Sequence, residues 1–141
     1  SHSRREAITV GAVGLASISG KIQPMTVTPN SDAVVADLIR KSEQANAALM
    51  DGDVETYLGL ITLSADFTLM SPFGGTPSRG AYSREHWAEI GRFFKNGSLR
   101  QEPVQAYATA DMVVLVVIEH GHGEVGGLAA QEWPLRVTTV Y

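Results

Sequence analysis

The stretch from Asp111 to Glu124, DMVVLVVIEHGHGE, constrains the fold of this chain more than any other. It starts with an unbroken run of β-branched and aliphatic residues, which is typical of a strand buried on both faces. It ends with polar residues that alternate with glycine, and His120, His122 and Glu124 recur at every second position. Because side chains two positions apart in a strand share a face, these three groups are predicted to point the same way. We therefore expect one strand to pass from the core to a cavity.

The size and composition of the chain indicate a single globular domain. Its 141 residues are enough to bury a core without a disulfide or a metal. The net charge of −4 argues against nucleic acid as a partner, because nucleic-acid-binding proteins carry basic patches. No cysteine is present, which excludes disulfides and thiolate chemistry but leaves the compartment open.

Residues 1–30 are predicted to precede the folded domain. Arg4 and Arg5 stand before a weakly apolar stretch, Thr9–Gly20, in a layout that resembles a twin-arginine export signal. The match is partial, since Ala7 stands where such a signal usually has an aromatic residue. Two interpretations stay open: export to the periplasm, with the signal followed by an extended linker, or an N-terminal arm of a cytoplasmic protein. The apolar stretch is shorter than the about 20 residues that span a bilayer, so no stable membrane anchor is expected.

Three helices are predicted from apolar residues spaced three and four apart. Gly52 suits the left-handed position that ends the first helix, and Asp53 is a good cap for the second. Ser31 and Ser83 are the expected caps of the first and third. The predicted helices run from Ser31 to about Met50, from Val54 to Ile61, and from Ser83 to a turn at Asn96-Gly97, with Val34 on the inner side of the first and Trp87 and Phe94 on that of the third.

Strands are predicted where this helical period is absent. Pro103 marks an edge or a bulge, and Gly126-Gly127 marks a turn. The predicted strands are Ala65–Ser71, which a turn-rich loop to Gly80 follows, then Leu99–Thr109, Met112–Glu124 and Ala130–Tyr141.

Several short motifs follow one another in a particular order. They are Asp51-Gly52-Asp53 between two helices, Asp66-Phe67-Thr68 leading to Ser71–Gly75 and Arg79-Gly80, and Leu135–Tyr141 in the last strand. Over residues 31–141 this order resembles the nuclear transport factor 2-like superfamily, and within it the SnoaL-like proteins. The resemblance implies an α+β fold, with three helices on the concave face of a cone-shaped, curved antiparallel sheet. It also implies one more strand after Tyr141.

The resemblance implies a pocket between sheet and helices, and a homodimer through the outer sheet face. The family includes ketosteroid isomerase, polyketide cyclases, dehydratases and non-catalytic association domains, so the fold alone does not select a reaction. Ketosteroid isomerase needs a carboxylate base, and an oxyanion hole made by a tyrosine and a protonated acid. Here Ser71 stands at the place of the base, the first helix has no tyrosine, and Pro134–Tyr141 contains no acid. Isomerase chemistry of that kind is not expected.

His120 and His122 are the candidate catalytic residues, because histidine titrates near physiological pH. Three interpretations stay open for them: the solvent end of the strand, which is the simplest, acid/base groups in the pocket, or part of a metal site. Arg136 shares a strand face with Thr138, and it needs an anionic partner, which Glu119, Glu132 or a ligand carboxylate would supply. The candidate ligand-binding residues are Tyr57, Ser71, Trp87, Arg136 and Thr138.

Two function hypotheses follow. The first is a small-molecule-binding domain for a small hydrophobic or carboxylate-bearing molecule, either a binder or an enzyme of isomerase, cyclase or hydrolase type, with no cofactor. The second is a non-catalytic association module whose functional surface is the outer face of the sheet.

Overall fold

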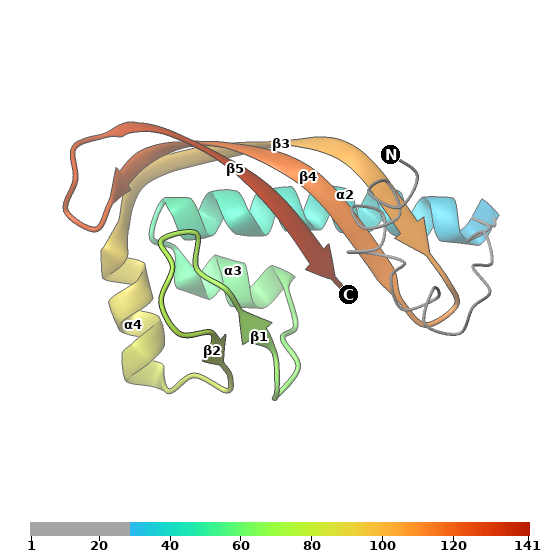
Figure 1. Cartoon of the computed structure of the whole chain (residues 1–141), viewed down its shortest axis with the longest axis horizontal. Coiled ribbons are helices and arrows are strands. Elements are labelled where there is room, and N and C mark those ends of the chain that lie inside the picture. Colours follow the sequence, from blue (N-terminus) through green and yellow to red (C-terminus); the bar gives the residue numbers. More distant parts are fainter. Residues whose placement is uncertain (1–28) are drawn as a thin grey trace.

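Three helices and two antiparallel sheets make up residues 29–141, the part of the chain that this computed structural model describes (Figure 1). The helices are α2 (Pro29–Met50), α3 (Val54–Leu60) and α4 (Arg84–Phe93), and the strands are β1 (Thr68–Leu69), β2 (Ser78–Arg79), β3 (Phe94–Ala108), β4 (Val113–Val125) and β5 (Gln131–Val140). The expected α+β class is confirmed. The predicted export signal and linker lie outside the described residues, apart from the two that open α2. No helix within residues 29–141 has the length and apolar character that a membrane crossing requires.

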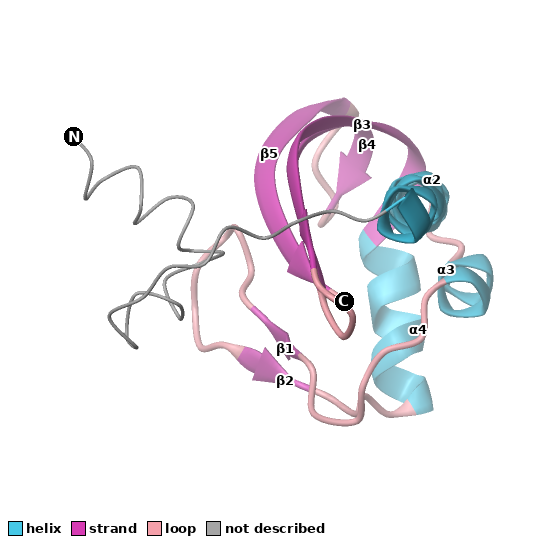
Figure 2. Cartoon of the chain, turned by 90° about the vertical axis from the view of Figure 1, so that its right-hand side faces the viewer, coloured by secondary structure: helices cyan, strands magenta, loops and turns pink. Residues whose placement is uncertain are grey.

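The three long strands form one antiparallel sheet in the order β3-β4-β5. Figure 1 shows this sheet arching over α2, and Figure 2 shows its curvature from the end of the molecule. Helix α2 packs on β3 and β4, α3 packs on α2, and α4 leads into β3. The concave side of the sheet therefore faces the helices.

The core lies between α2 and the inward residues of β3 and β4. On β4, Val113, Leu115 and Val117 are nearly inaccessible to solvent, because α2 and the β3 residue Ala108 cover them. Each buried aliphatic side chain of this kind contributes about 1.5–3 kcal/mol to stability. Leu38 and its neighbours Val35 and Ile39 on α2 complete the cluster. Val34, which we expected on the same side, is 51% exposed.

Two of the three predicted helix starts are confirmed by the cap geometry. The Asp53 carboxylate accepts a hydrogen bond from Thr56 N at 3.0 Å at the start of α3. The Ser83 hydroxyl accepts one from His86 N at 3.1 Å at the start of α4. The third prediction is wrong, since α2 begins at Pro29, two residues before Ser31.

The predicted end of the third helix is wrong. Phe94 already belongs to β3 and pairs with Val125, so the helix ends at Phe93. Asn96 has a φ of 52°, and the register shifts between Lys95 and Ser98, so the expected turn is a bulge inside β3. Pairing with β4 ends the helix earlier than the local sequence indicates.

The first predicted strand is much shorter than expected. Only Thr68–Leu69 pairs, and its partner is the unpredicted strand β2 within the loop that follows. Both residues of β1 are exposed, because the long sheet is complete without them. The bulge at Pro103 and the turn at Gly126-Gly127 are confirmed, since the register shifts between Pro103 and Gln105 and both glycines have positive φ.

Candidate functional site

His120 and His122 lie on the outer side of the sheet. On β4 they alternate with Glu119 and Gly121, which are buried on the side that faces α2. The His120 Nε2 atom is 2.9 Å from Glu102 Oε2 on β3, and both side chains are largely exposed. Among the described residues, no three histidine or acidic side chains converge as a metal site would require.

Arg136 and Thr138 also lie on the outer side, because they are exposed positions of β5 that alternate with half-buried ones. Ser71 is exposed in the loop after β1, where its hydroxyl accepts a hydrogen bond from Phe73 N at 3.1 Å. Arg136 and Thr138 therefore share the outer face of β5, away from the inner side of the sheet, and Ser71 belongs to a loop outside that sheet.

Tyr57 and Trp87, the other two predicted ligand-binding residues, come together. Their ring centroids are 5.9 Å apart, and Trp87 is 5.2 Å from Tyr82, which in turn is 5.0 Å from Phe67. All four rings are only partly buried, and neither α3 nor α4 has a buried residue. We refer to Tyr57, Phe67, Tyr82 and Trp87 as the aromatic cluster. Its rings keep part of their surface accessible to solvent.

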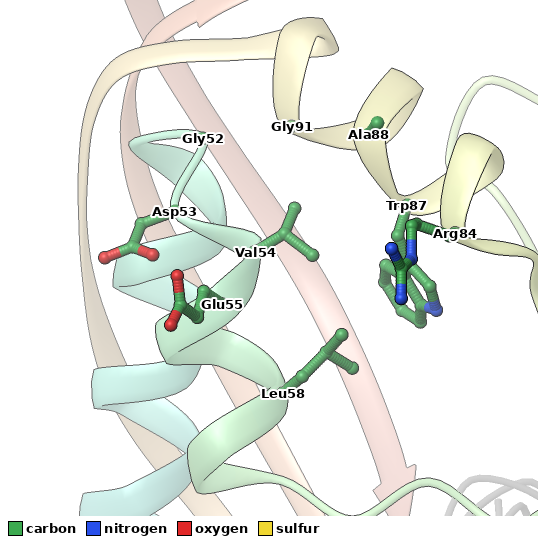
Figure 3. Close-up of a pocket in the computed structure, with 9 residues that line it drawn as sticks. All are labelled: Gly52, Asp53, Val54, Glu55, Leu58, Arg84, Trp87, Ala88 and Gly91. Carbon is green, nitrogen blue, oxygen red and sulfur yellow. The ribbon is translucent and has the colours of Figure 1, made fainter.

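A groove of about 900 Å³ separates α3 from α4 next to the aromatic cluster (Figure 3). Val54 and Leu58 point from α3 toward α4, and Trp87 and Arg84 stand on the opposite wall. Gly52, in the turn before α3, allows this turn to approach the end of α4 closely, because a Cβ on Gly52 would overlap the backbone oxygens of Gly91 and Phe94. The groove is lined by Gly52, Asp53, Val54, Glu55, Leu58, Arg84, Trp87, Ala88 and Gly91.

Glu119 is the candidate functional residue that the sequence interpretation missed. Its side chain faces α2 and leaves 9% of the residue exposed. Asn46 Nδ2 donates to Glu119 Oε1 at 2.9 Å and to Gln101 Oε1 at 3.2 Å. Gln101 Nε2 donates to the Ser42 hydroxyl at 2.9 Å, and Gln101 N donates to Glu43 Oε2 at 2.7 Å. We call these five residues the inner polar cluster.

The environment of Glu119 favours its neutral form. Burial raises the pKa of its carboxyl, and the hydrogen bond from Asn46 opposes this only in part. Burial also raises the pKa of Tyr57 and of Tyr141, and the negative charge of Glu119 adds to the increase in both. An acid and two phenols from three different elements therefore influence one another electrostatically.

One oxygen of Glu119 is open to further contact. Asn46 bonds to Oε1, and no residue in the described range bonds to Oε2. Glu119 as a whole keeps 9% of its surface accessible to solvent. A group that binds there would meet a carboxyl group able to accept or donate a proton.

The sequence did contain a signal for Glu119. It continues the alternation of Val113, Leu115 and Val117, so it shares their inward face. Comparisons of the chain with protein-family models, with curated proteins and with solved structures found no match.

Proposed function

We propose that this chain is a small-molecule-binding domain of the nuclear transport factor 2-like, SnoaL-like type. Its ligand is held between the concave side of the sheet and helices α3 and α4. The observation that carries this proposal is Glu119, a buried carboxyl group with one oxygen open and no basic partner among residues 29–141. A buried acid costs stability unless it is fully paired, so its presence here is better explained by a functional role than by stability.

The aromatic cluster supplies the apolar part of the proposed site. The ring of Tyr57 is 5.9 Å from that of the groove residue Trp87, and the charge of Glu119 contributes to the raised pKa of Tyr57. In the proposed arrangement, the rings contact the apolar part of the ligand and the carboxyl group contacts its polar end. Most ligand sites combine an apolar wall with a few polar groups in this way.

The proposed ligand is a small hydrophobic molecule. A carboxylate-bearing ligand was expected because of Arg136, but Arg136 is on the outer face and Glu119 would repel an anion. Acid/base chemistry of isomerase, cyclase or hydrolase type is available to a carboxyl group with a raised pKa. Plain binding needs only the rings and the hydrogen-bonding group.

The test uses N-phenyl-1-naphthylamine, a neutral aromatic probe whose fluorescence rises in apolar sites. The wild type is expected to bind it saturably, and Trp87→Ala to bind it at least about tenfold more weakly, since a buried aromatic side chain contributes about 1.5–3 kcal/mol. Leu58→Glu, at a position already 40% exposed, charges the groove with little risk to folding and is expected to weaken binding too. His122→Ala, on the outer face, is the control. Equal binding by all four proteins would show that the site is elsewhere.

A non-catalytic association module is the second candidate. The outer sheet face exposes apolar side chains on both edge strands, with Val104 58% and Val140 60% accessible. Such an association would bury these apolar side chains. If the chain is an association module, the wild type is a dimer and Val140→Glu is expected to make it a monomer, as measured by light scattering. Binding of the fluorescent probe would then be unrelated to the function of the domain.

A further inference from the structure

Glu119 has no cation beside it in the described part of the chain. The ion pairs there join Asp37 to Arg40 and Lys41, or an acid to a histidine at the surface. Asn46 is the hydrogen-bond donor to Glu119, and an amide provides no positive charge. When Glu119 ionises, its charge therefore lacks a counter-charge from residues 29–141.

The rings beside this acid provide surfaces that suit a cation. Tyr57, Trp87 and Tyr82 form a continuous row with centroid distances of 5.9 and 5.2 Å, and each ring keeps some accessible surface. A cation over an aromatic face is attracted by the negative face of the ring, and more strongly where water is excluded. Tyr141, at the end of β5, adds a further half-buried ring close enough to be affected by the charge of Glu119.

Acidic residues outnumber basic ones at the groove. Asp53 and Glu55 are among the residues that line it, and Arg84 is the one basic residue of the described range that does so. The chain as a whole has a net charge of −4, which raises the local concentration of cations.

We infer that the ligand is an organic cation, an amine or quaternary ammonium ion on an apolar body, whose charge meets Glu119 while its body lies against Tyr57 and Trp87. This inference rests on the proposed function of the same site. A neutral apolar ligand would gain nothing from the charge of Glu119, and an anionic one would be repelled.

The inference predicts that affinity depends on pH. Bound cation favours the ionised acid, so affinity rises as pH rises through the titration of Glu119 and is constant above it. Burial raises the pKa of Tyr57 and Tyr141 above 10, so both stay neutral between pH 5 and 8. The titratable or charged groups of the described residues around the site are Glu43 on α2, Asp53, Glu55 and Tyr57 at the start of α3, Tyr82 before α4, Arg84 and His86 in the first turn of α4, and Tyr141 after β5.

The experiment compares benzyltrimethylammonium with neopentylbenzene, its neutral isostere, in displacement of N-phenyl-1-naphthylamine at pH 5 to 8. The wild type is expected to prefer the cation by about tenfold at pH 8, and this preference is expected to decrease toward pH 5. Glu119→Gln keeps an oxygen that accepts the bond from Asn46, so it is expected to fold and to lose the preference. Glu102→Gln is the matched control, since it makes the same chemical change on the outer face of the neighbouring strand.

The outcomes distinguish a failure of the cation inference from a failure of the proposed function. Binding of both compounds without a preference, or a preference that survives in Glu119→Gln, overturns the cation inference alone. If the wild type binds neither compound nor the fluorescent probe, the proposed function is overturned as well.

Discussion

Replacement of Asn46 by alanine tests whether the inner polar cluster supports Glu119. Asn46 donates one hydrogen bond to the carboxyl oxygen of Glu119 and one to the amide oxygen of Gln101. Removing a bond to a charged group costs about 1.5–3 kcal/mol, and removing a neutral one about 0.5–1.5 kcal/mol. The better helix propensity of alanine returns up to about 0.7 kcal/mol. The free energy of unfolding is therefore expected to decrease by about 1.3–3.8 kcal/mol.

The assay is urea denaturation at pH 8, with Gln44→Ala as the control. Gln44 is an exposed amide on the same helix, so its replacement is expected to change stability by less than about 0.5 kcal/mol. At acidic pH the Glu119 carboxyl is protonated and its bond to Asn46 is neutral, so the deficit of Asn46→Ala is expected to shrink. Equal stability of the two variants at pH 8 would refute the reasoning, because Asn46 would then contribute no more than a surface residue.

Two further predictions concern Glu119 and Gly97. The folded protein binds the Glu119 proton more tightly than the unfolded chain, because burial raises its pKa above the ordinary 4.5. Protonated Glu119 therefore stabilises the folded state; this stabilisation is complete below pH 4.5 and is lost as pH rises through the pKa of Glu119 in the folded protein. Each tenfold difference in proton affinity between the folded and the unfolded chain corresponds to about 1.4 kcal/mol of stability. Glutamine does not ionise, so the Glu119→Gln variant does not lose stability in this way as pH rises. Its thermal midpoint is therefore expected to rise relative to that of the wild type between pH 4.5 and 8. A difference between the two midpoints that does not depend on pH would contradict this. A Cβ on Gly97 would overlap the Met50 carbonyl, whereas Gly74 has a positive φ of 86° and open space around it. Gly74→Ala is expected to lower the free energy of unfolding by roughly 1–2 kcal/mol, and Gly97→Ala is expected to lower it by more, as measured by urea denaturation. The reverse order would show that the close approach of Gly97 to Met50 is relaxed in solution.

Local signals in the sequence predicted the helix and strand order. Gly52 and Asp53 act through their own backbone geometry and an adjacent amide, and neither needs knowledge of distant residues. The same holds for the Ser83 cap and for the turn at Gly126-Gly127. These features depend on contacts between residues close together in the chain, so a single sequence reveals them.

Long-range pairing decided the positions that were predicted wrongly. Asn96-Gly97 suits both a helix end and a bulge, since both require a residue with positive φ beside glycine. The choice depends on Phe94, which pairs with Val125 far along the chain. In the same way, Ala65–Ser71 has a strand pattern, but only Thr68–Leu69 finds a partner.

Alternation defines two faces of a strand without telling which one is covered, so the sequence alone did not place the predicted site residues relative to the helix layer. Both faces of β4 are apolar up to Ile118, so the sequence pattern there does not say whether the face that ends in Glu119 or the face that ends in His120 meets the helix layer. Helix α2 settles the choice, since its inward stripe contains Ser42 and Asn46, and these polar groups need polar partners inside the fold. Glu119 together with Gln101 satisfies them, whereas His120 pairs with the exposed Glu102 on the other side. The acid thus depends on α2 for its burial, and any chemistry of this domain that uses Glu119 depends on the same helix.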